Sequence, residues 1–344
     1  MSTELPHAAT PNVTLARKVA FLSRSESYAA RPRHVDRVET HMSWVFLTDE
    51  HVYKLKKPLR RPFLDFSTLE ARHRNALEEV RLNRRLARDV YLGVVALTTR
   101  DGQALELDGA GTPVEWLVKM RRLPQALMLD QAIRDGTVTE ASIDRLMDVL
   151  AGFYRAAVPV PVSGRAYVQR FERDVNAAQS VLCDTKYALS SDALQPTTHA
   201  LLAFLAEDAE PLKRRAEARR IIEAHGDLRP EHVCLTDTPV IIDCLEFNRA
   251  FRILDPVDEL AHLAVECEQL GAALIGERIL AAYEDRTGDR ADRRLVSFYK
   301  AYRATLRAKL AIWHLDDRDA RERDKWIERT KEYLALAARH ARSL

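Results

Sequence analysis

Residues 225–232 read His-Gly-Asp-Leu-Arg-Pro-Glu-His, and the apolar run Val-Ile-Ile at 240–242 ends at Asp243. The first acid, Asp227, lies in a short predicted loop, whereas Asp243 closes a run that is typical of a buried strand. The interval between them is long enough for a tight strand–loop–strand excursion. Two carboxylates that return to one place suit phosphoryl transfer, in which one orients a hydroxyl group and the other holds Mg²⁺ on ATP.

Each acid also has a purely structural interpretation. Asp227 suits an Asx turn that closes a loop. Asp243 suits a strand-end carboxylate that is paired with a cation, because an isolated buried charge is costly. We favour the functional interpretation of both, because a strand–loop–strand excursion of this length returns the second acid to the place of the first.

The overall composition limits the class of protein. The chain has 344 residues, 53 basic and 51 acidic, for a net charge of +2. This balance gives no electrostatic footprint for a nucleic-acid partner. No apolar run approaches the length of a membrane span, and the polar, proline-containing start does not resemble a signal peptide. Four cysteines without C-x-x-C spacing suit reduced thiols, so we predict a cytoplasmic protein without a membrane partner.

The sequence pattern changes after Pro124, where helical periodicity begins to dominate. We predict a leader segment over residues 1–30, followed by a small lobe over residues 31–121 with several strands and one long helix. Within it, 48–50 is a predicted hairpin turn, and Ser67 to Glu70 form a predicted capping box for the helix. Helical periodicity dominates residues 122–344. We therefore predict an α+β fold with a sheet-rich N-lobe and a larger, mainly helical C-lobe.

The motif His225 to Asp227, with Asp243 and the later segment 255–261, resembles the aminoglycoside phosphotransferase-like branch of the protein-kinase-like fold. Segments 39–47, 52–58, 63–68 and 82–86 look like an uncharacterised bacterial subgroup of that family, some members of which carry a following P-loop ATPase domain. This chain has no G-x-x-x-x-G-K-[ST] motif, so it looks like the kinase-like half alone. The resemblance covers roughly residues 30–315 and implies a bilobal fold that binds ATP.

The resemblance also implies residue roles in the N-lobe. It implies an ATP-anchoring lysine on the third strand, paired with a glutamate of the helix. Lys54 and Lys56 share one strand face, so alternation does not separate them; we favour Lys54, with Glu79 as its partner. Thr40 and Ser43 are candidate phosphate contacts in a loop that has no glycine. The hinge between the lobes is expected at 116–121.

His232 is the sharpest departure from the kinase pattern, which places a metal-binding Asn five residues after the catalytic Asp. Imidazole is a poorer ligand for Mg²⁺ than oxygen, whereas Mn²⁺ tolerates nitrogen better. Three outcomes follow for the metal site: a metal bound by His232 and Asp243, a single-metal site or a damaged site. We expect retained activity with Mn²⁺ at least as effective as Mg²⁺.

The sequence therefore predicts an ATP-dependent phosphotransferase that acts on a hydroxyl of a small molecule, with Asp227 as the catalytic residue. The alternatives are a nucleotide-binding pseudokinase or regulatory module, and a protein kinase or protein nucleotidyltransferase. Glu246 is predicted either to contact metal or substrate or to pair with Arg249 or Arg252. Glu259 is assigned, with Glu266 and Glu268, to a mostly solvated helix face.

Overall fold

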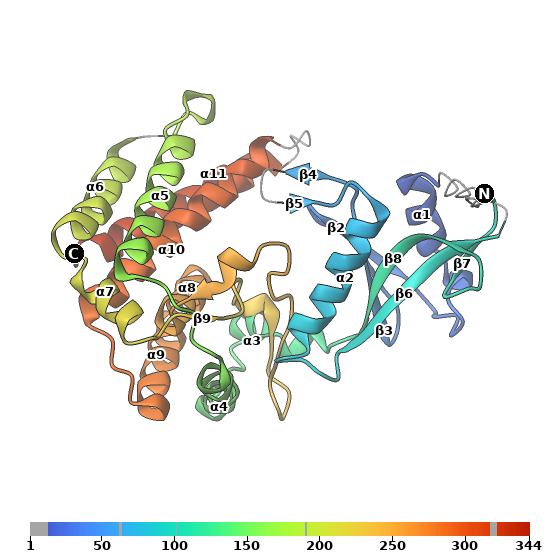
Figure 1. Cartoon of the computed structure of the whole chain (residues 1–344), viewed down its shortest axis with the longest axis horizontal. Helices are drawn as coiled ribbons and strands as arrows, with labels where there is room; N and C mark the ends of the chain where they lie inside the picture. Colours follow the sequence, from blue (N-terminus) through green and yellow to red (C-terminus); the bar gives the residue numbers. More distant parts are fainter. Residues whose placement is uncertain (1–12, 62–63, 101, 190, 317–321) are drawn as a thin grey trace, which may run out of the picture. The chain divides into compact units, whose positions relative to one another are not determined.

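The computed structural model describes residues 13–61, 64–100, 102–189, 191–316 and 322–344. The chain forms two compact units (Figure 1). Unit 1 comprises Met1–Pro124 and Ile241–Asn248, and unit 2 comprises Gln125–Val240 and Arg249–Leu344. The predicted fold class is confirmed, since unit 1 contains the main sheet and unit 2 is mainly helical. Unit 1 passes to unit 2 after Pro124, where the sequence pattern changes, and the later segment that carries Asp243 also belongs to unit 1.

Unit 1 is built on a six-stranded antiparallel sheet with the order β1-β2-β3-β8-β6-β7. These strands are β1 (Asp36–Glu39), β2 (Ser43–Leu47), β3 (His51–Lys56), β6 (Tyr91–Thr99), β7 (Leu105–Leu107) and β8 (Thr112–Arg121). A separate short hairpin consists of β4 (Arg60–Arg61) and β5 (Leu64–Asp65). The predicted turn between β2 and β3 is confirmed, and the Thr48 N–H donates to the carbonyl of His51 at 2.8 Å.

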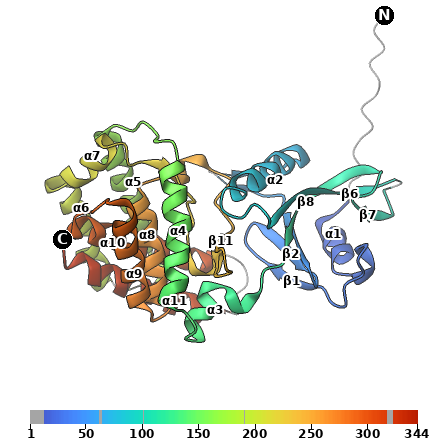
Figure 2. The same ribbon diagram turned by 90° about the horizontal axis from the view of Figure 1, so that it is seen from below.

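Helices α1 (Leu15–Leu22) and α2 (Leu69–Asn83) of unit 1 lie on opposite sides of the sheet (Figure 2). Alternation along β3 sends Tyr53 and Leu55 into the apolar cluster that includes residues of α1. The same alternation sends Lys54 and Lys56 toward the side of α2, where Glu79 binds both. One strand thus supplies an apolar face and a charged face.

The predicted leader, residues 1–30, is not a separate segment over its whole length. Residues 1–12 lie outside the described part of the chain. From residue 15 onward α1 packs on the sheet, with Leu22 fully buried in the apolar cluster. The Lys18 ammonium lies 2.8 Å from Glu115 Oε2 of β8, and both side chains are buried. The amphipathic spacing of Leu15, Val19 and Leu22 is the signal for this packing.

The start of α2 corrects the predicted capping box. The capping residue is Thr68, whose hydroxyl accepts from the Ala71 N–H at 3.1 Å. The Ser67 hydroxyl instead donates to Asp65 Oδ1 at 2.5 Å. The helix therefore begins one residue later than the box requires, and Glu70 falls in its first turn, where a negative charge is favourable.

Unit 2 is an assembly of helices with short strand pairs. Its helices are α3 (Leu129–Arg134), α4 (Glu140–Ala156), α5 (Gly164–Leu182), α6 (Ser191–Glu207), α7 (Glu210–Glu217), α8 (Pro256–Gln269), α9 (Ala273–Thr287), α10 (Arg293–Trp313) and α11 (Arg323–Ala341). Strands β9 (Ile222–Glu223) and β12 (Ile253–Leu254) pair within it, and β10 (Val233–Cys234) and β11 (Val240–Ile241) follow the His-Gly-Asp loop. None of the helices within the described residues is long and apolar enough to cross a membrane.

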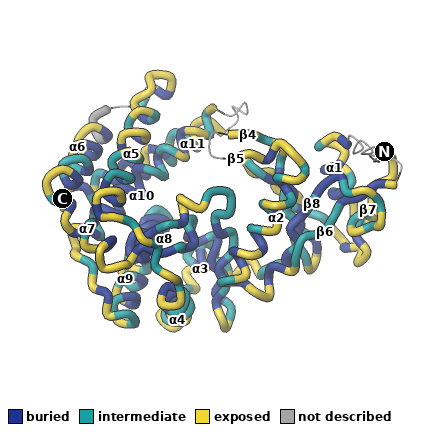
Figure 3. The backbone as a smooth tube through the Cα atoms, in the orientation of Figure 1, coloured by how far each residue is buried: buried dark blue, intermediate teal, exposed yellow. Residues whose placement is uncertain are grey.

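Helix α8 is the buried centre of unit 2, and Figure 3 shows its backbone mostly in the colour of buried residues. Asp255 caps it, with Oδ1 accepting from the Val257 N–H at 3.0 Å, the role that Asp commonly has at a helix N-terminus. Arg215 binds Asp255 as well, with Nε 2.6 Å from Oδ2. The basic run 213–220 has the charge pattern of a solvated helix face, but Arg215 within it is buried. Arg303 likewise holds Asp258 at 2.6 Å.

Candidate functional site

A compact charged cluster lies on the α2 side of β3. The Lys54 ammonium is 3.0 Å from Glu79 Oε1 and 2.6 Å from Asp243 Oδ1. Glu79 is fully buried, Lys54 is 14% exposed, and the Asp243 side chain is 42% exposed. The structure therefore brings together three residues that the sequence predicted for nucleotide and metal binding, with the cation between the two acids.

Lys56 makes a second set of ion pairs in the same cluster. Its ammonium lies 2.5 Å from Glu79 Oε2 and 2.5 Å from Glu246 Oε1. Only 2% of the Lys56 side chain is exposed, and the ammonium also lies 5.2 Å from the centre of the Phe66 ring. Arg249 and Arg252, which we considered as partners of Glu246, bind Glu223 in unit 2.

The pKa shifts follow from burial and from this charge arrangement. For Lys54, burial opposes the charged form, but Asp243 and Glu79 outweigh it and hold the pKa of Lys54 well above its ordinary value. For Glu246, burial is the dominant cause and raises the pKa of its carboxyl, although Lys56 opposes the rise. For Glu79, burial raises the pKa, but Lys54 and Lys56 overcome it and leave the pKa lowered. Two ammonium groups thus share three carboxylates.

Asp243 has an uncommon backbone conformation. Its φ is +60°, in the left-handed region that residues other than glycine seldom occupy. Such outliers cost free energy, persist where the surroundings enforce them and concentrate at functional sites. The Asp243 carboxylate is partly exposed, and its oxygen atoms are the kind of ligand that Mg²⁺ prefers.

The second acid of the sequence motif, Asp227, lies in unit 2. Its N–H donates to His225 Nδ1 at 3.3 Å, and Gly226 has a φ of +90° that favours glycine at this turn. The Arg229 guanidinium lies 3.7 Å from Asp227 Oδ2, and 30% of the Asp227 side chain is exposed. The acid is thus fixed by its loop and still reachable from solvent.

Basic side chains around Asp227, Arg229 foremost, keep it ionised. Burial alone would raise its pKa, but Arg229, His232, His262 and Arg307 together lower the pKa of Asp227 to about 2. A carboxylate with so low a pKa is a weak base. It is suited to accepting a hydrogen bond from a hydroxyl group and orienting it.

Glu259 is a site residue that the sequence did not reveal, and its assignment to a solvated face was wrong. It is 1% exposed, and Oε1 accepts from the backbone N–H groups of His225 at 2.9 Å and Gly226 at 2.7 Å. Oε2 accepts from the Tyr154 hydroxyl at 2.9 Å. Burial raises the pKa of Glu259 despite these donors. One carboxylate of α8 therefore holds the backbone of the His-Gly-Asp loop, and only tertiary structure shows this.

His232 is oriented by the same loop. Its Nδ1 lies 2.8 Å from the backbone carbonyl of Asp227 and 3.7 Å from Asp227 Oδ2. Because a carbonyl only accepts, Nδ1 carries the proton in this contact. Among the described residues, no three His, Cys, Asp or Glu side chains gather in an arrangement that would hold a metal ion.

Of the candidate phosphate contacts, Thr40 lies in the turn between β1 and β2, and Ser43 is the first residue of β2. The Thr40 hydroxyl donates to the Ser43 carbonyl at 3.0 Å and accepts from the Ser43 N–H at 3.0 Å. Ser43 is 2% exposed. The structure thus gives the Thr40 hydroxyl a role in closing this turn.

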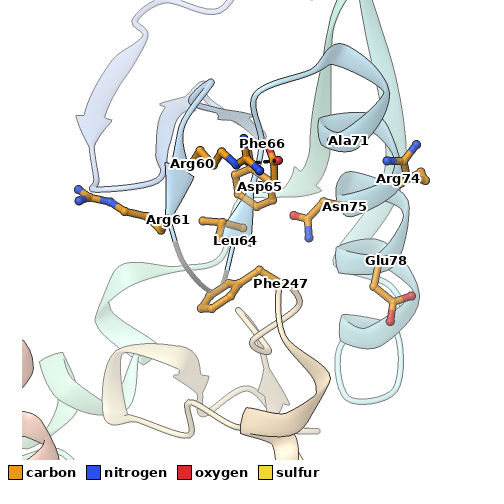
Figure 4. Close-up of a pocket in the computed structure, with 10 residues that line it drawn as sticks. All are labelled: Arg60, Arg61, Leu64, Asp65, Phe66, Ala71, Arg74, Asn75, Glu78 and Phe247. Carbon is orange, nitrogen blue, oxygen red and sulfur yellow. Dashed lines mark ion pairs between the residues drawn. The ribbon is translucent and has the colours of Figure 1, made fainter. Parts of the chain in front are cut away.

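A cavity of about 640 Å³ lies in unit 1 between the β4–β5 hairpin and α2 (Figure 4). Phe66 and Phe247 contribute aromatic walls, and Asn75 points from α2 toward the hairpin, whereas Arg74 points away from it. The cavity adjoins the charged cluster, since Phe66 lies beside the Lys56 ammonium and Phe247 follows Glu246.

Comparison with known proteins gives relatives in sequence and in structure. No model of a known protein family matches the chain. Uncharacterised proteins of Mycobacterium tuberculosis and Mycobacterium bovis are 32% identical to it over 282 residues, which is 80% of this chain and 54% of each relative. The chain thus spans about half the length of the curated relatives it matches.

Several solved kinases share the architecture. A choline/ethanolamine kinase family protein from Mesorhizobium loti matches 95% of this chain and 98% of its own, with a TM-score of 0.52 and 15% identity. A thermostable mutant of the aminoglycoside phosphotransferase APH(4)-Ia, in complex with AMP-PNP and hygromycin B, matches 94% and 97%, with a TM-score of 0.54 and 10% identity. The GDP complex of aminoglycoside 2'-phosphotransferase-IIIa matches 90% and 93%, with a TM-score of 0.51 and 17% identity.

Proposed function

Because the chain has the protein-kinase-like fold of the aminoglycoside phosphotransferases and the choline/ethanolamine kinases, we propose that it is an ATP-dependent phosphotransferase that acts on a hydroxyl of a small molecule. The observation that carries the proposal is the Glu79–Lys54–Asp243 ion-pair chain in unit 1. An ionised Asp227 fixed in the His-Gly-Asp loop of unit 2 supports it. These are the residue types that phosphoryl transfer uses.

Asp227 is assigned to the acceptor. Phosphoryl transfer needs little covalent chemistry from the protein, so most of the catalysis is positioning and charge stabilisation. With a pKa of about 2, Asp227 orients the acceptor hydroxyl and receives its proton late, when the oxygen has already begun to bond to phosphorus. Glu259 supports this role by holding the backbone N–H groups of His225 and Gly226.

Lys54 and Asp243 are assigned to the nucleotide. Asp243 would hold a metal ion through its carboxylate, and that ion would supply positive charge to the nucleotide phosphates. Lys54 is the phosphate lysine in this proposal, because it is more exposed than Lys56 and already lies beside Asp243. Thr40 and Ser43 remain candidates for phosphate contact through the turn that they close.

The test is to incubate the chain with labelled ATP and a panel of small hydroxyl compounds, including amino sugars and amino alcohols, beside a proteome sample. Transfer to a small molecule supports the proposal. Nucleotide binding without transfer to any acceptor supports a pseudokinase or regulatory module, and label on protein supports a protein kinase or nucleotidyltransferase. A chain that binds no nucleotide in calorimetry contradicts all three functions.

We further expect Mn²⁺ to sustain turnover at least as well as Mg²⁺, because His232 stands where the kinase pattern has an oxygen donor. Replacing His232 with Asn should shift the preference toward Mg²⁺. The measurement is turnover of the wild type and the variant over a concentration series of each metal. A strong Mg²⁺ preference in the wild type would contradict a metal-binding role for His232.

A further inference from the structure

The strained conformation of Asp243 is held from both sides by buried side chains of unit 1. The Asp243 N–H donates to the hydroxyl oxygen of Tyr91, at the start of β6, at 3.0 Å. The next N–H, that of Cys244, donates to Oδ1 of Asn83, at the end of α2, at 2.8 Å. Asn83 and Tyr91 are each 1% exposed, so water does not compete with either bond.

These two bonds determine the backbone at Asp243. The peptide group before its Cα carries the Asp243 N–H, and the peptide group after it carries the Cys244 N–H. Fixing the orientation of both groups fixes φ and ψ of the residue between them. A left-handed φ at a residue with a side chain persists only where its surroundings enforce it, and Tyr91 and Asn83 supply that constraint.

The amide nitrogen of the Asn83 side chain makes a second hydrogen bond. Its Nδ2 donates to the backbone carbonyl of Glu79, one turn earlier in α2, at 2.9 Å. The same amide therefore connects the helical turn that carries Glu79 with the peptide that follows Asp243. An amide has both a donor and an acceptor, so no other side chain of similar size makes this pair of contacts without a change in charge.

We propose that Asn83 and Tyr91 are positioning residues that hold Asp243 in its metal-binding conformation and couple it to Glu79. The metal-binding role of Asp243 rests on the proposed function. That Tyr91 and Asn83 hold the backbone of Asp243 and Cys244 does not depend on it. Groups that orient metal ligands without touching the metal typically contribute 10–100-fold to metal affinity. We therefore expect their loss to weaken metal binding much more than metal-free nucleotide binding.

The experiment compares Asn83→Leu and Tyr91→Phe with the wild type in the full chain. Titration calorimetry measures Mn²⁺ affinity in the presence of ADP, and ADP affinity without metal. Each variant should bind Mn²⁺ about 10-fold or more weakly, with metal-free ADP affinity changed less than about 3-fold. The double variant should lose less than the two single losses combined, since both bonds hold one residue.

The matched control is Asn176→Leu. Asn176 makes the same bond to the carbonyl four residues earlier, to Glu172 at 2.8 Å, but on an exposed face of α5. It should leave Mn²⁺ affinity unchanged. Asn83→Asp separates the two ends of the amide, because it keeps an acceptor for the Cys244 N–H and removes the donor to the Glu79 carbonyl.

Hydrogen exchange at the amides of residues 243 and 244 decides the structural claim without any ligand. Both amides should exchange faster in Asn83→Leu and in Tyr91→Phe, while the rest of unit 1 keeps its protection. Unchanged exchange in both variants, or unchanged Mn²⁺ affinity beside intact nucleotide binding, would overturn the inference. If the wild type binds neither Mn²⁺ nor nucleotide, the proposed function and the metal role fail together, and exchange still decides whether the two side chains hold the loop.

Discussion

Replacement of Asp227 with Asn is expected to lower turnover by about 10³-fold, within the range that general acid–base groups contribute. The amide keeps the size of the side chain but removes the charge that orients the acceptor hydroxyl. Nucleotide affinity should change only a few-fold, because Lys54 and Asp243 of unit 1 are assigned to the nucleotide. Single-turnover kinetics with a saturating acceptor, beside calorimetric titration of ATP, measures both quantities.

The control is Asp237→Asn, which removes an exposed carboxylate a few residues further along the chain. It should leave turnover within about 2-fold, as surface substitutions away from a site usually do. Near-normal turnover in Asp227→Asn would remove this acid from the mechanism. A loss of ATP binding in that variant would show that it acts on the nucleotide rather than on the acceptor.

The pH dependence follows from the same acid. Its pKa is lowered from 3.8 to about 2 because Arg229 and its neighbouring cations outweigh burial. The stabilisation that comes from the ionised form is therefore present above about pH 4 and is lost as the pH falls through about 2. We expect no acid limb from Asp227 in the turnover profile above pH 4, and an acid limb near pH 6 that disappears in Asp227→Asn would contradict its low pKa.

Replacement of the two lysines of β3 should affect different properties, stability for Lys56 and ATP affinity for Lys54. Lys56→Met is expected to destabilise the fold by about 3–5 kcal/mol, because it leaves Glu79 and Glu246 buried without their shared cation. Lys54→Met should be less destabilising, since its partner Asp243 is partly exposed. It should instead weaken ATP binding by about 10-fold or more, the effect of losing one charge-assisted hydrogen bond. Urea unfolding and ATP titration of both variants separate the two effects.

The Lys56→Met defect should shrink at lower pH. Burial already raises the pKa of Glu246, so the carboxylate that loses its cation takes up a proton more readily and the uncompensated charge disappears. Lys57→Met is the control, because Lys57 pairs with the exposed Glu39 and should contribute less than about 1 kcal/mol. If Lys56→Met unfolds like Lys57→Met, or if it weakens ATP binding while Lys54→Met does not, the assignment is reversed.

The sequence predicted the fold and the main acids because these depend on local patterns. Asp227 and Asp243 stand out through their neighbours. The resemblance implies a helix Glu, and Glu79 matches it through its spacing from Leu82 and Leu86, whereas the adjacent Glu78 binds Arg81 on the surface. The two lysines remained unresolved, because strand alternation gives them the same face. Their distinction depends on Glu246 and Asp243, which are distant in sequence.

The sequence misleads about charged side chains whose partners are distant along the chain. Glu259 and Arg215 look like solvated helix residues, yet each is buried against groups more than 30 residues away in the chain. Burying a charge requires a complete set of partners, and no local pattern reveals such a set. The role of Asn83 has no local sequence signal for the same reason, because its contact with the Cys244 N–H forms only in the folded chain.

The division of unit 1 along the chain has a consequence for synthesis. Its sheet is complete by Pro124, but the segment Ile241–Asn248, with two of the carboxylates that neutralise Lys54 and Lys56, is translated much later. At about 5–20 residues per second, ribosomes need on the order of 6–25 seconds to add the intervening stretch. During that time the nascent sheet carries two lysines with Glu79 as their available counterion. Release of a ribosome-bound chain ending at Pro124 should therefore yield a sheet that is less stable than the same unit in the finished protein.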